Sequence, residues 1–167
     1  MHAFQPFPIE ELEFNPFEKI GKEWALVSAG SKQKANTMTV SWGGVGVLWG
    51  KNVVFIFIRD SRYTKEFIDS GDFFSVSFMS ESYKKALNYC GSHSGKNKDK
   101  MAGAGLTWNY KHSIPFIDEG SFILLCQKMS ATKITEASFL SPDIKKWYTD
   151  GDLHTMYVGE IIEVLAR

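Results

Sequence analysis

Hydrophobic residues along the chain fall into short runs and alternating stretches that are typical of strands, separated by turns and brief helical segments. Six stretches predict strands, at residues 24–28, 38–42, 53–58, 74–78, 122 to about 134, and 154–165. The third is apolar throughout and rich in β-branched and aromatic residues, which predicts a strand buried on both faces. In the fourth, Ser75 and Ser77 alternate with apolar residues, which predicts one solvent-facing side.

Short segments between these strands predict helices, at residues 62–68, 81–89, 98–104 and 143–148. The first 17 residues hold three of the five prolines and predict an extended arm with a short turn after Asn15 and Pro16. The glycines from Gly43 to Gly46 permit a bend or a close approach by another group. Several strands with only brief helices predict one mainly β domain over residues 1–167, a barrel or a sandwich.

Composition narrows the function classes. The 167 residues are 44% hydrophobic and 14% aromatic, which is enough for one core and also suits a pocket for a flat ring. The formal net charge is zero, so no long-range field attracts a polyanion, and we expect no nucleic-acid partner. Lysines cluster near residues 96–100 and 145–146, and such clusters are by themselves typical of a solvated surface.

The two cysteines are too few for a disulfide framework, which indicates a reducing compartment. Cys126 lies in an apolar run and is expected to be a core residue. Cys90 and His93 form a CxxH pair with no second pair of ligands, so we expect no metal site. The sequence shows neither a signal-peptide pattern nor an apolar run of about 20 residues, so we expect a cytoplasmic protein without a membrane partner.

Three segments carry candidate chemistry. In the first, from Asn36 to Gly43, small hydroxyl and amide side chains follow a strand that leads into glycines. Its backbone N–H groups and hydroxyls can meet one edge of a polar heterocycle, with Met38 or Trp42 against the ring face. Because threonine and serine are common in strands, this segment alone fits an ordinary half-exposed strand better.

The second segment, from Arg59 to Thr64, lies where a helix is expected to begin. A helix start offers unpaired N–H groups and a positive dipole end, which favour a phosphate. Arg62 adds a bidentate donor, and Ser61 and Thr64 add hydroxyls. Helix capping by Ser61 beside a surface arginine explains the same residues equally well.

The third segment, from Cys90 to Lys100, is a loop with two glycines, two serines and several lysines that can close on a phosphate. It lacks the GxxxxGK[ST] spacing of a P-loop, and a solvated connecting loop is a strong alternative. The chain contains no GxSxG, GxGxxG or HExxH motif, which leaves nucleophilic-serine, Rossmann and zinc-protease chemistry unsupported.

Taken in order, these segments resemble the flavin reductase-like family of FMN-binding split barrels. The resemblance is carried by residues 36–43, by Ser61 to Thr64, and by the Cys-Gly-Ser-x-Ser-Gly run at 90–95 that leads to Asp99 and Lys100. It implies a mainly β fold, a six-stranded antiparallel split barrel with a few short helices. It also implies a homodimer with FMN near the subunit interface, and NADH or NADPH as the donor in many members.

The resemblance also implies which residues bind the cofactor. The isoalloxazine ring would be lined by Asn36, Thr37, Met38, Thr39, Val40, Ser41 and Trp42. The phosphate would be held by Ser61, Arg62, Tyr63 and Thr64, with Arg59 assisting and with Ser92, Lys96 and Lys100 completing the site. No acid–base residue is named as catalytic, because hydride chemistry belongs to the flavin.

Two departures from the family pattern bear on this site. Lys96 and Asn97 stand where the family often has arginine and aspartate, so a planar guanidinium fork is lost there. Asp60 replaces a common proline and brings a carboxylate near the phosphate, which Arg59 or Arg62 would have to neutralise.

The function implied is a flavin-dependent NAD(P)H oxidoreductase that passes electrons to free flavin, iron or an acceptor protein. A flavoprotein that carries electrons or binds a partner without nicotinamide activity of its own fits the sequence as well. A structural barrel with a decayed site is a third reading, against which Arg62, Thr64 and the 36–39 segment argue.

Overall fold

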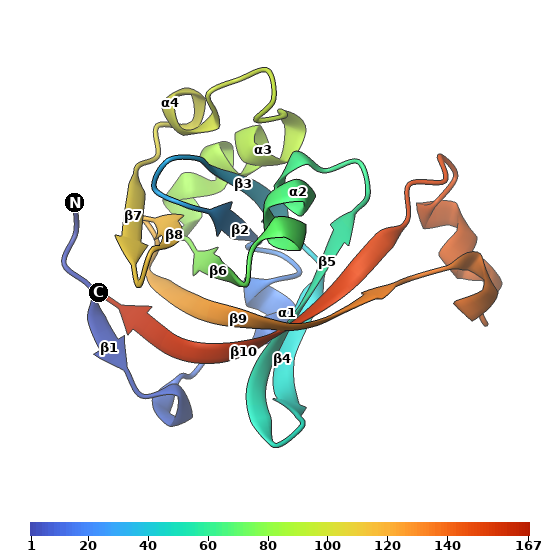
Figure 1. The fold of residues 1–167 in the computed structure, drawn as a ribbon, viewed down its shortest axis with the longest axis horizontal. Coiled ribbons are helices and arrows are strands. Elements are labelled where there is room, and N and C mark those ends of the chain that lie inside the picture. The colour runs from blue at the N-terminus through green and yellow to red at the C-terminus, as the bar shows by residue number, and fades with distance from the viewer.

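One antiparallel sheet of eight strands organises the fold in a computed structural model that describes residues 1–167 (Figure 1). Its strands run in the order β3-β2-β6-β9-β10-β5-β4, and β1 pairs with β10. Their bounds are Gln5–Phe7 (β1), Ala25–Gly30 (β2), Ala35–Val40 (β3), Gly43–Leu48 (β4), Lys51–Arg59 (β5), Phe73–Phe78 (β6), Phe122–Lys133 (β9) and His154–Ala166 (β10). A separate hairpin is formed by β7 (Trp108–Lys111) and β8 (Ile114–Ile117).

The sheet curls until β3 lies close to β5, but no hydrogen-bonded ladder joins them. The barrel is therefore split, and the antiparallel split barrel expected from the sequence is confirmed. The six predicted strands correspond to β2, β3, β5, β6, β9 and β10. The sheet also contains two strands that were not predicted, β1 and β4.

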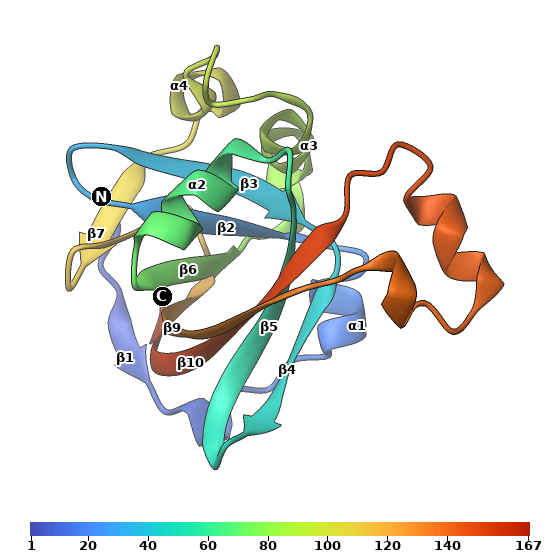
Figure 2. The ribbon, with the colours of Figure 1, turned by 45° about the vertical axis from the view of Figure 1, so that its right-hand side comes forward.

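Helices are short and lie outside the sheet (Figure 2). The α-helices are Pro16–Lys19 (α1), Tyr63–Ser70 (α2), Lys84–Ser92 (α3) and Lys100–Ala104 (α4), and the 3-10 turns are Ile9–Glu11, Glu81–Tyr83, Glu136–Ser138 and Pro142–Trp147. These include the four predicted helical segments, although their bounds differ by several residues. None of the helices has the length and apolar character needed to cross a membrane.

The main core fills the barrel with side chains from its six central strands. Phe74, Ile56 and Tyr157 are almost completely buried there, together with Cys126, as the sequence predicted for that cysteine. On β10, Gly159 leaves room for the Phe74 ring, because a Cβ at this glycine would lie 2.4 Å from the Phe74 Cζ atom. The core therefore depends on one small residue as much as on large ones.

One prediction about β6 is wrong. Ser75 and Ser77 are completely buried, whereas their alternation with apolar residues predicted a solvent-facing side. The β7–β8 hairpin covers this side: Ser75 Oγ donates to the Pro115 carbonyl at 2.6 Å, and the Ile117 N–H donates to Ser77 Oγ at 3.2 Å. Hydrogen bonds to a segment 40 residues away thus satisfy both hydroxyls, and local alternation does not reveal such a cover.

A second correction concerns residues 38–46. The strand predicted at 38–42 begins earlier and ends at Val40, and the glycine-rich run forms the edge strand β4. Gly43 has φ +145°, and a Cβ there would lie 2.5 Å from the Phe55 carbonyl oxygen. This close approach of β4 to β5 requires glycine, so the run forms a strand as well as a bend.

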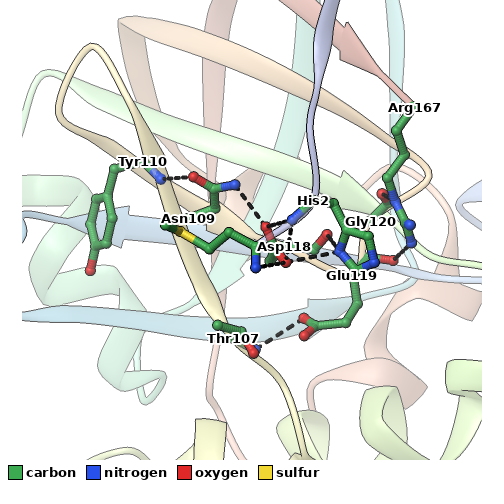
Figure 3. A network of polar contacts seen from close by, with 9 residues as sticks. His2, Thr107, Asn109, Tyr110, Asp118, Glu119, Gly120 and Arg167 are labelled. Carbon is green, nitrogen blue, oxygen red and sulfur yellow. Dashed lines mark hydrogen bonds and ion pairs between the residues drawn. The ribbon is translucent and has the colours of Figure 1, made fainter.

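Asp118 fastens the N-terminal segment of the chain to the β7–β8 hairpin (Figure 3). Its carboxylate, only 3% exposed, accepts hydrogen bonds from the His2 backbone N–H at 3.0 Å and from Asn109 Nδ2 at 2.7 Å, and lies 2.8 Å from His2 Nδ1. Burial acts to raise the pKa of Asp118, but these hydrogen bonds outweigh it and hold the pKa below its usual value.

We predict that this carboxylate makes folding stability depend on acid pH. A carboxyl group whose pKa is lowered by folding stabilises the protein above its unfolded pKa, and this contribution disappears as pH falls below about 4. Asp118→Asn should therefore lower the free energy of unfolding at pH 7 by about 1–3 kcal/mol and by much less at pH 3. Urea unfolding at several pH values, with the exposed Asp143→Asn as control, measures this; an equal loss at both pH values contradicts it.

Candidate functional site

Two pockets meet at the Arg62 side chain. The first, here called the main pocket, has a volume of about 310 Å³ and is lined by Met38, Thr39, Val40, Ser41, Trp42, Phe57, Arg59, Arg62, Trp147 and His154. The second, the side pocket, has a volume of about 190 Å³ and is lined by Ser61, Arg62, Tyr63, Thr64, Ser92, His93, Ser94 and Lys100. Together they bring the three predicted segments into one region of the molecule.

Strand β3 and the two residues after it form one wall of the main pocket. Five of the seven residues predicted to line a ring do line this pocket, from Met38 to Trp42. The other two lie behind it: Asn36 Nδ2 donates to Thr64 Oγ1 at 2.8 Å, and Thr37 Oγ1 donates to the Val27 carbonyl at 3.1 Å. Asn36 thus ties β3 to the start of α2, and the Thr37 hydroxyl belongs to the core.

The start of α2 faces the side pocket. Arg62 occupies the N-cap position without a side-chain cap, so the alternative in which Ser61 caps the helix is wrong. Ser61 instead donates through its backbone N–H to Asp152 Oδ1 at 3.0 Å, and through its hydroxyl to Oδ2 of the same residue. The N–H groups of Tyr63 and Thr64 have no acceptor in the chain, which leaves two donors beside an anion-sized pocket.

Arg62 is half-buried and is held by the end of α3. Its Nη1 donates to the Gly91 carbonyl at 2.8 Å, and its Nη2 donates to the Cys90 carbonyl at 3.4 Å. Burial lowers the pKa of Arg62, and the nearby charge of Asp152 opposes this shift. A guanidinium fixed at the junction of the two pockets can bind an anion in one while contacting a ligand in the other.

Lys100 is the second cation of the side pocket and is only 5% exposed. Its Nζ donates to the carbonyls of Thr37 and Cys90, each at 2.8 Å. These bonds leave one of the three N–H donors without an acceptor in the chain. Burial, followed by the charge of Arg62, lowers the pKa of Lys100 to about 8.

The third segment contains two other predicted residues, Ser92 and Lys96, and only Ser92 lines the side pocket. The Ser92 hydroxyl donates to the Asn88 carbonyl at 2.9 Å. Lys96 is not a lining residue, because its Nζ pairs with Glu66 at 2.7 Å and lies 5.2 Å from the Tyr63 ring centroid. The charge of Lys96 is therefore largely compensated at the rim.

Arg59 anchors the segment between β9 and β10, residues 134–153, which we call the arm and which projects from the barrel in Figure 1. Its guanidinium donates to the carbonyls of Trp147 at 2.9 Å and Asp152 at 2.8 Å, and lies 5.3 Å from the Tyr148 ring centroid. These contacts direct Arg59 toward the arm and the main pocket, and Arg59 does not line the side pocket. Asp60 pairs with Lys133 at 2.9 Å rather than with Arg59 or Arg62.

The arm brings aromatic groups to the main pocket. The Trp42 ring lies 5.3 Å from the Trp147 ring at right angles to it, and 5.0 Å from the His154 ring. His154 Nδ1 is 2.8 Å from the Tyr148 hydroxyl, and burial, followed by the charge of Arg59, lowers the pKa of His154. The pocket can therefore hold a flat, partly polar ring beside a neutral imidazole.

Sequence reasoning missed Phe57, Trp147 and His154 in this pocket. Phe57 lies on β5, Trp147 on the arm and His154 on β10. The antiparallel pairing of β10 with β5 brings these two strands together, with His154 opposite Arg59. The available signal was slight: His154 begins a predicted strand shortly after Gly151 and Asp152. No cluster of three or more His, Cys, Asp or Glu side chains suitable for a metal ion is found.

We predict that Arg59→Ala loosens the arm. The variant loses two charge-assisted hydrogen bonds to arm carbonyls, each contributing about 1.5–3 kcal/mol, so the local opening equilibrium should rise at least about tenfold. Limited proteolysis within residues 134–153 measures this, with Lys133→Ala as a matched control at the end of β9. Equal cleavage rates for Arg59→Ala and the wild type would contradict the anchoring role.

The fold agrees with the family comparison. The chain belongs to the flavin reductase like domain family, whose model matches residues 17–167. No curated protein matches the sequence. The matched region includes all residues that line the two pockets and leaves out residues 1–16.

Solved structures give the same fold. Flavoredoxin from Methanosarcina acetivorans is 26% identical, with a TM-score of 0.68 over 87% of this chain and 68% of that chain. An FMN-binding domain of a flavin reductases-like enzyme from Shewanella baltica OS155 is 17% identical, with a TM-score of 0.71 over 98% and 77%. An NADH:FAD oxidoreductase of Streptomyces globisporus C-1027, solved with NAD and FAD fragments, is 17% identical, with a TM-score of 0.62 over 85% and 73%.

Proposed function

We propose that the protein is an FMN-binding oxidoreductase in which NADH or NADPH reduces a flavin held across the two pockets. The observation that carries this proposal is their junction at Arg62. A pocket with aromatic and hydroxyl groups adjoins a cationic pocket of phosphate size, as a molecule with a flat ring and a phosphate ester requires.

The side pocket supplies the groups that a phosphate monoester needs. Arg62 and Lys100 offer positive charge, and the free N–H groups of Tyr63 and Thr64 lie at a helix start. Lys100 keeps one N–H donor without an acceptor in the chain. No carboxylate lines this pocket. These residues would bind and orient the phosphate.

The main pocket would orient the ring. Residues 38–41 offer backbone groups and small hydroxyls, while Trp42 and Trp147 offer apolar surface. His154 and Tyr148, joined at 2.8 Å, can hold a proton at the edge of the pocket. The bound flavin would supply the hydride chemistry, which no protein residue needs to perform.

A flavin-carrying electron-transfer protein without NAD(P)H activity of its own is the second candidate. Its specific support is the 26% identity with flavoredoxin over most of this chain. The reductase is favoured by the open main pocket, and the NADH:FAD oxidoreductase shows that this fold can serve such a reaction.

We further propose that the protein acts as a homodimer, with an acceptor protein or free flavin as the electron acceptor. Exposed apolar residues gather at two protruding parts of the chain, the arm, with Leu140 and Trp147, and the β4–β5 turn, with Val47 and Trp49. Burial of such residues between two copies would account for them. The two unpaired cysteines fit the proposed cytoplasmic location.

Anaerobic mixing of the FMN-loaded protein with NADH or NADPH tests the donor. Rapid loss of the flavin absorbance with either nucleotide supports the reductase and identifies the preferred donor. A spectrum that persists with both nucleotides contradicts the reductase and supports the electron carrier.

A further inference from the structure

His93 lies in the wall of the side pocket, between Ser92 and Ser94. Its ring stacks on Tyr89 at 4.0 Å with an interplanar angle of 17°. Its Nδ1 is 3.1 Å from the Tyr89 carbonyl oxygen and 3.0 Å from Ser92 Oγ. Because a carbonyl oxygen only accepts, Nδ1 carries the hydrogen in the neutral ring, and Nε2 is the atom that gains a proton.

The charges around His93 are predominantly positive. On α2, Arg62 faces the pocket beside the uncharged Tyr63 and Thr64; on α4, Lys100 does so. On its own helix, His93 is preceded by Tyr89 and the buried Cys90. In the loop that follows, Lys96 pairs with Glu66. Asp152, whose charge acts on Arg62, is bonded to Ser61.

No carboxylate lines this pocket, so the positive charges of Arg62 and Lys100 are not balanced within it. The ammonium group of Lys100 is enclosed next to Arg62 and meets only carbonyl oxygens. Its lowered pKa of about 8 leaves a part of the population neutral in mildly alkaline solution. A dianionic phosphate would favour the charged forms of both Lys100 and His93.

We propose that His93 is a further polar ligand of the phosphate, and that His93 and Lys100 take up a proton when a flavin phosphate monoester binds. Retention of the cofactor then weakens as pH rises. This inference rests on the proposed function and deepens it, since it gives the site a pH response that the flavin ring alone would not produce.

The sign of the effect follows from linkage. A ligand that binds the protonated form preferentially loses affinity as pH rises through the pKa of the free protein, by up to about tenfold per pH unit for each proton taken up. The phosphate ester has its own second ionisation near pH 6, so measurements above pH 7 keep it mainly dianionic. Histidine ordinarily changes charge between pH 5 and 8, and Lys100 adds a response near pH 8.

Isothermal titration of flavin-free protein with FMN, in buffers of different ionisation enthalpy, counts the protons taken up at pH 7 and pH 8. Riboflavin, which lacks the phosphate, is the reference ligand. We expect proton uptake with FMN at both pH values, none with riboflavin, and an FMN affinity that falls about tenfold between pH 7 and pH 9. In His93→Gln, which keeps a polar group without titrating, uptake at pH 7 should be lost while uptake at pH 8 persists.

The control is His112→Gln, because His112 pairs with Glu163 at 3.1 Å and lines neither pocket. Equal uptake at pH 7 in His93→Gln and the wild type would overturn the role of His93. Binding of both flavins without any proton uptake would overturn the inference and leave flavin binding intact. Failure of both flavins to bind would refute the proposed function itself.

Discussion

Arg62→Ala is expected to weaken FMN binding about a hundredfold while the affinity for riboflavin changes by less than about threefold. The substitution removes the guanidinium at the junction of the two pockets and with it charge-assisted hydrogen bonds that contribute about 1.5–3 kcal/mol each. Riboflavin lacks the phosphate and so loses little. Titration followed by quenching of flavin fluorescence measures both affinities.

The variant also loses the bonds from Arg62 to the carbonyls of Gly91 and Cys90, so its melting temperature must be measured alongside. Arg62→Lys keeps the charge without the planar fork and should give an intermediate FMN affinity. Lys98→Ala, which removes a positive charge from the loop at residues 90–100 but lines neither pocket, is the matched control. An unchanged FMN affinity in a folded Arg62→Ala protein would remove Arg62 from the phosphate site.

Gly159→Ala is expected to lower the free energy of unfolding by about 2 kcal/mol and the melting temperature by about 4–8 °C. The added Cβ would lie 2.4 Å from Phe74 Cζ and 3.1 Å from Cys126 Cβ, and both of these side chains are completely buried. The core must therefore shift to accept one methyl group.

Gly44→Ala is the matched control, because a Cβ there has no heavy atom within 4 Å. It lies on the edge strand β4, also in the sheet, and should change the melting temperature by no more than about 1–2 °C. Thermal unfolding followed by circular dichroism compares the two variants. Equal stability of both would show that β10 has room above Phe74.

The barrel could be predicted because its strands carry strong local patterns. The apolar run at 53–58 and the long stretches before and after the arm are strands whatever surrounds them. The β7–β8 hairpin was missed because its strands have only four residues each. The burial of Ser75 and Ser77, which this hairpin causes, was missed for the same reason. Whether a short segment forms a strand depends on the residues that it packs against, and a local sequence pattern does not carry this information.

The candidate site, like the fold, could be predicted from the sequence only in part. The residues predicted for the phosphate position adjoin one another because Arg62 and Thr64 share a helix start and Lys100 begins another helix. The roles of individual side chains depended on distant partners: Arg59 is drawn to the arm, and the Thr37 hydroxyl to β2. The aromatic part of the main pocket depends on the arm, which sequence alone did not connect to the pocket.

The most direct test of the account is a titration of the purified protein with FMN, beginning from its absorbance spectrum. We expect bound flavin, or saturable FMN binding if the protein is colourless, with tighter binding of FMN than of riboflavin because of the side pocket. No binding of either flavin, even with excess FMN, would contradict the account and leave a split barrel whose two pockets serve another ligand.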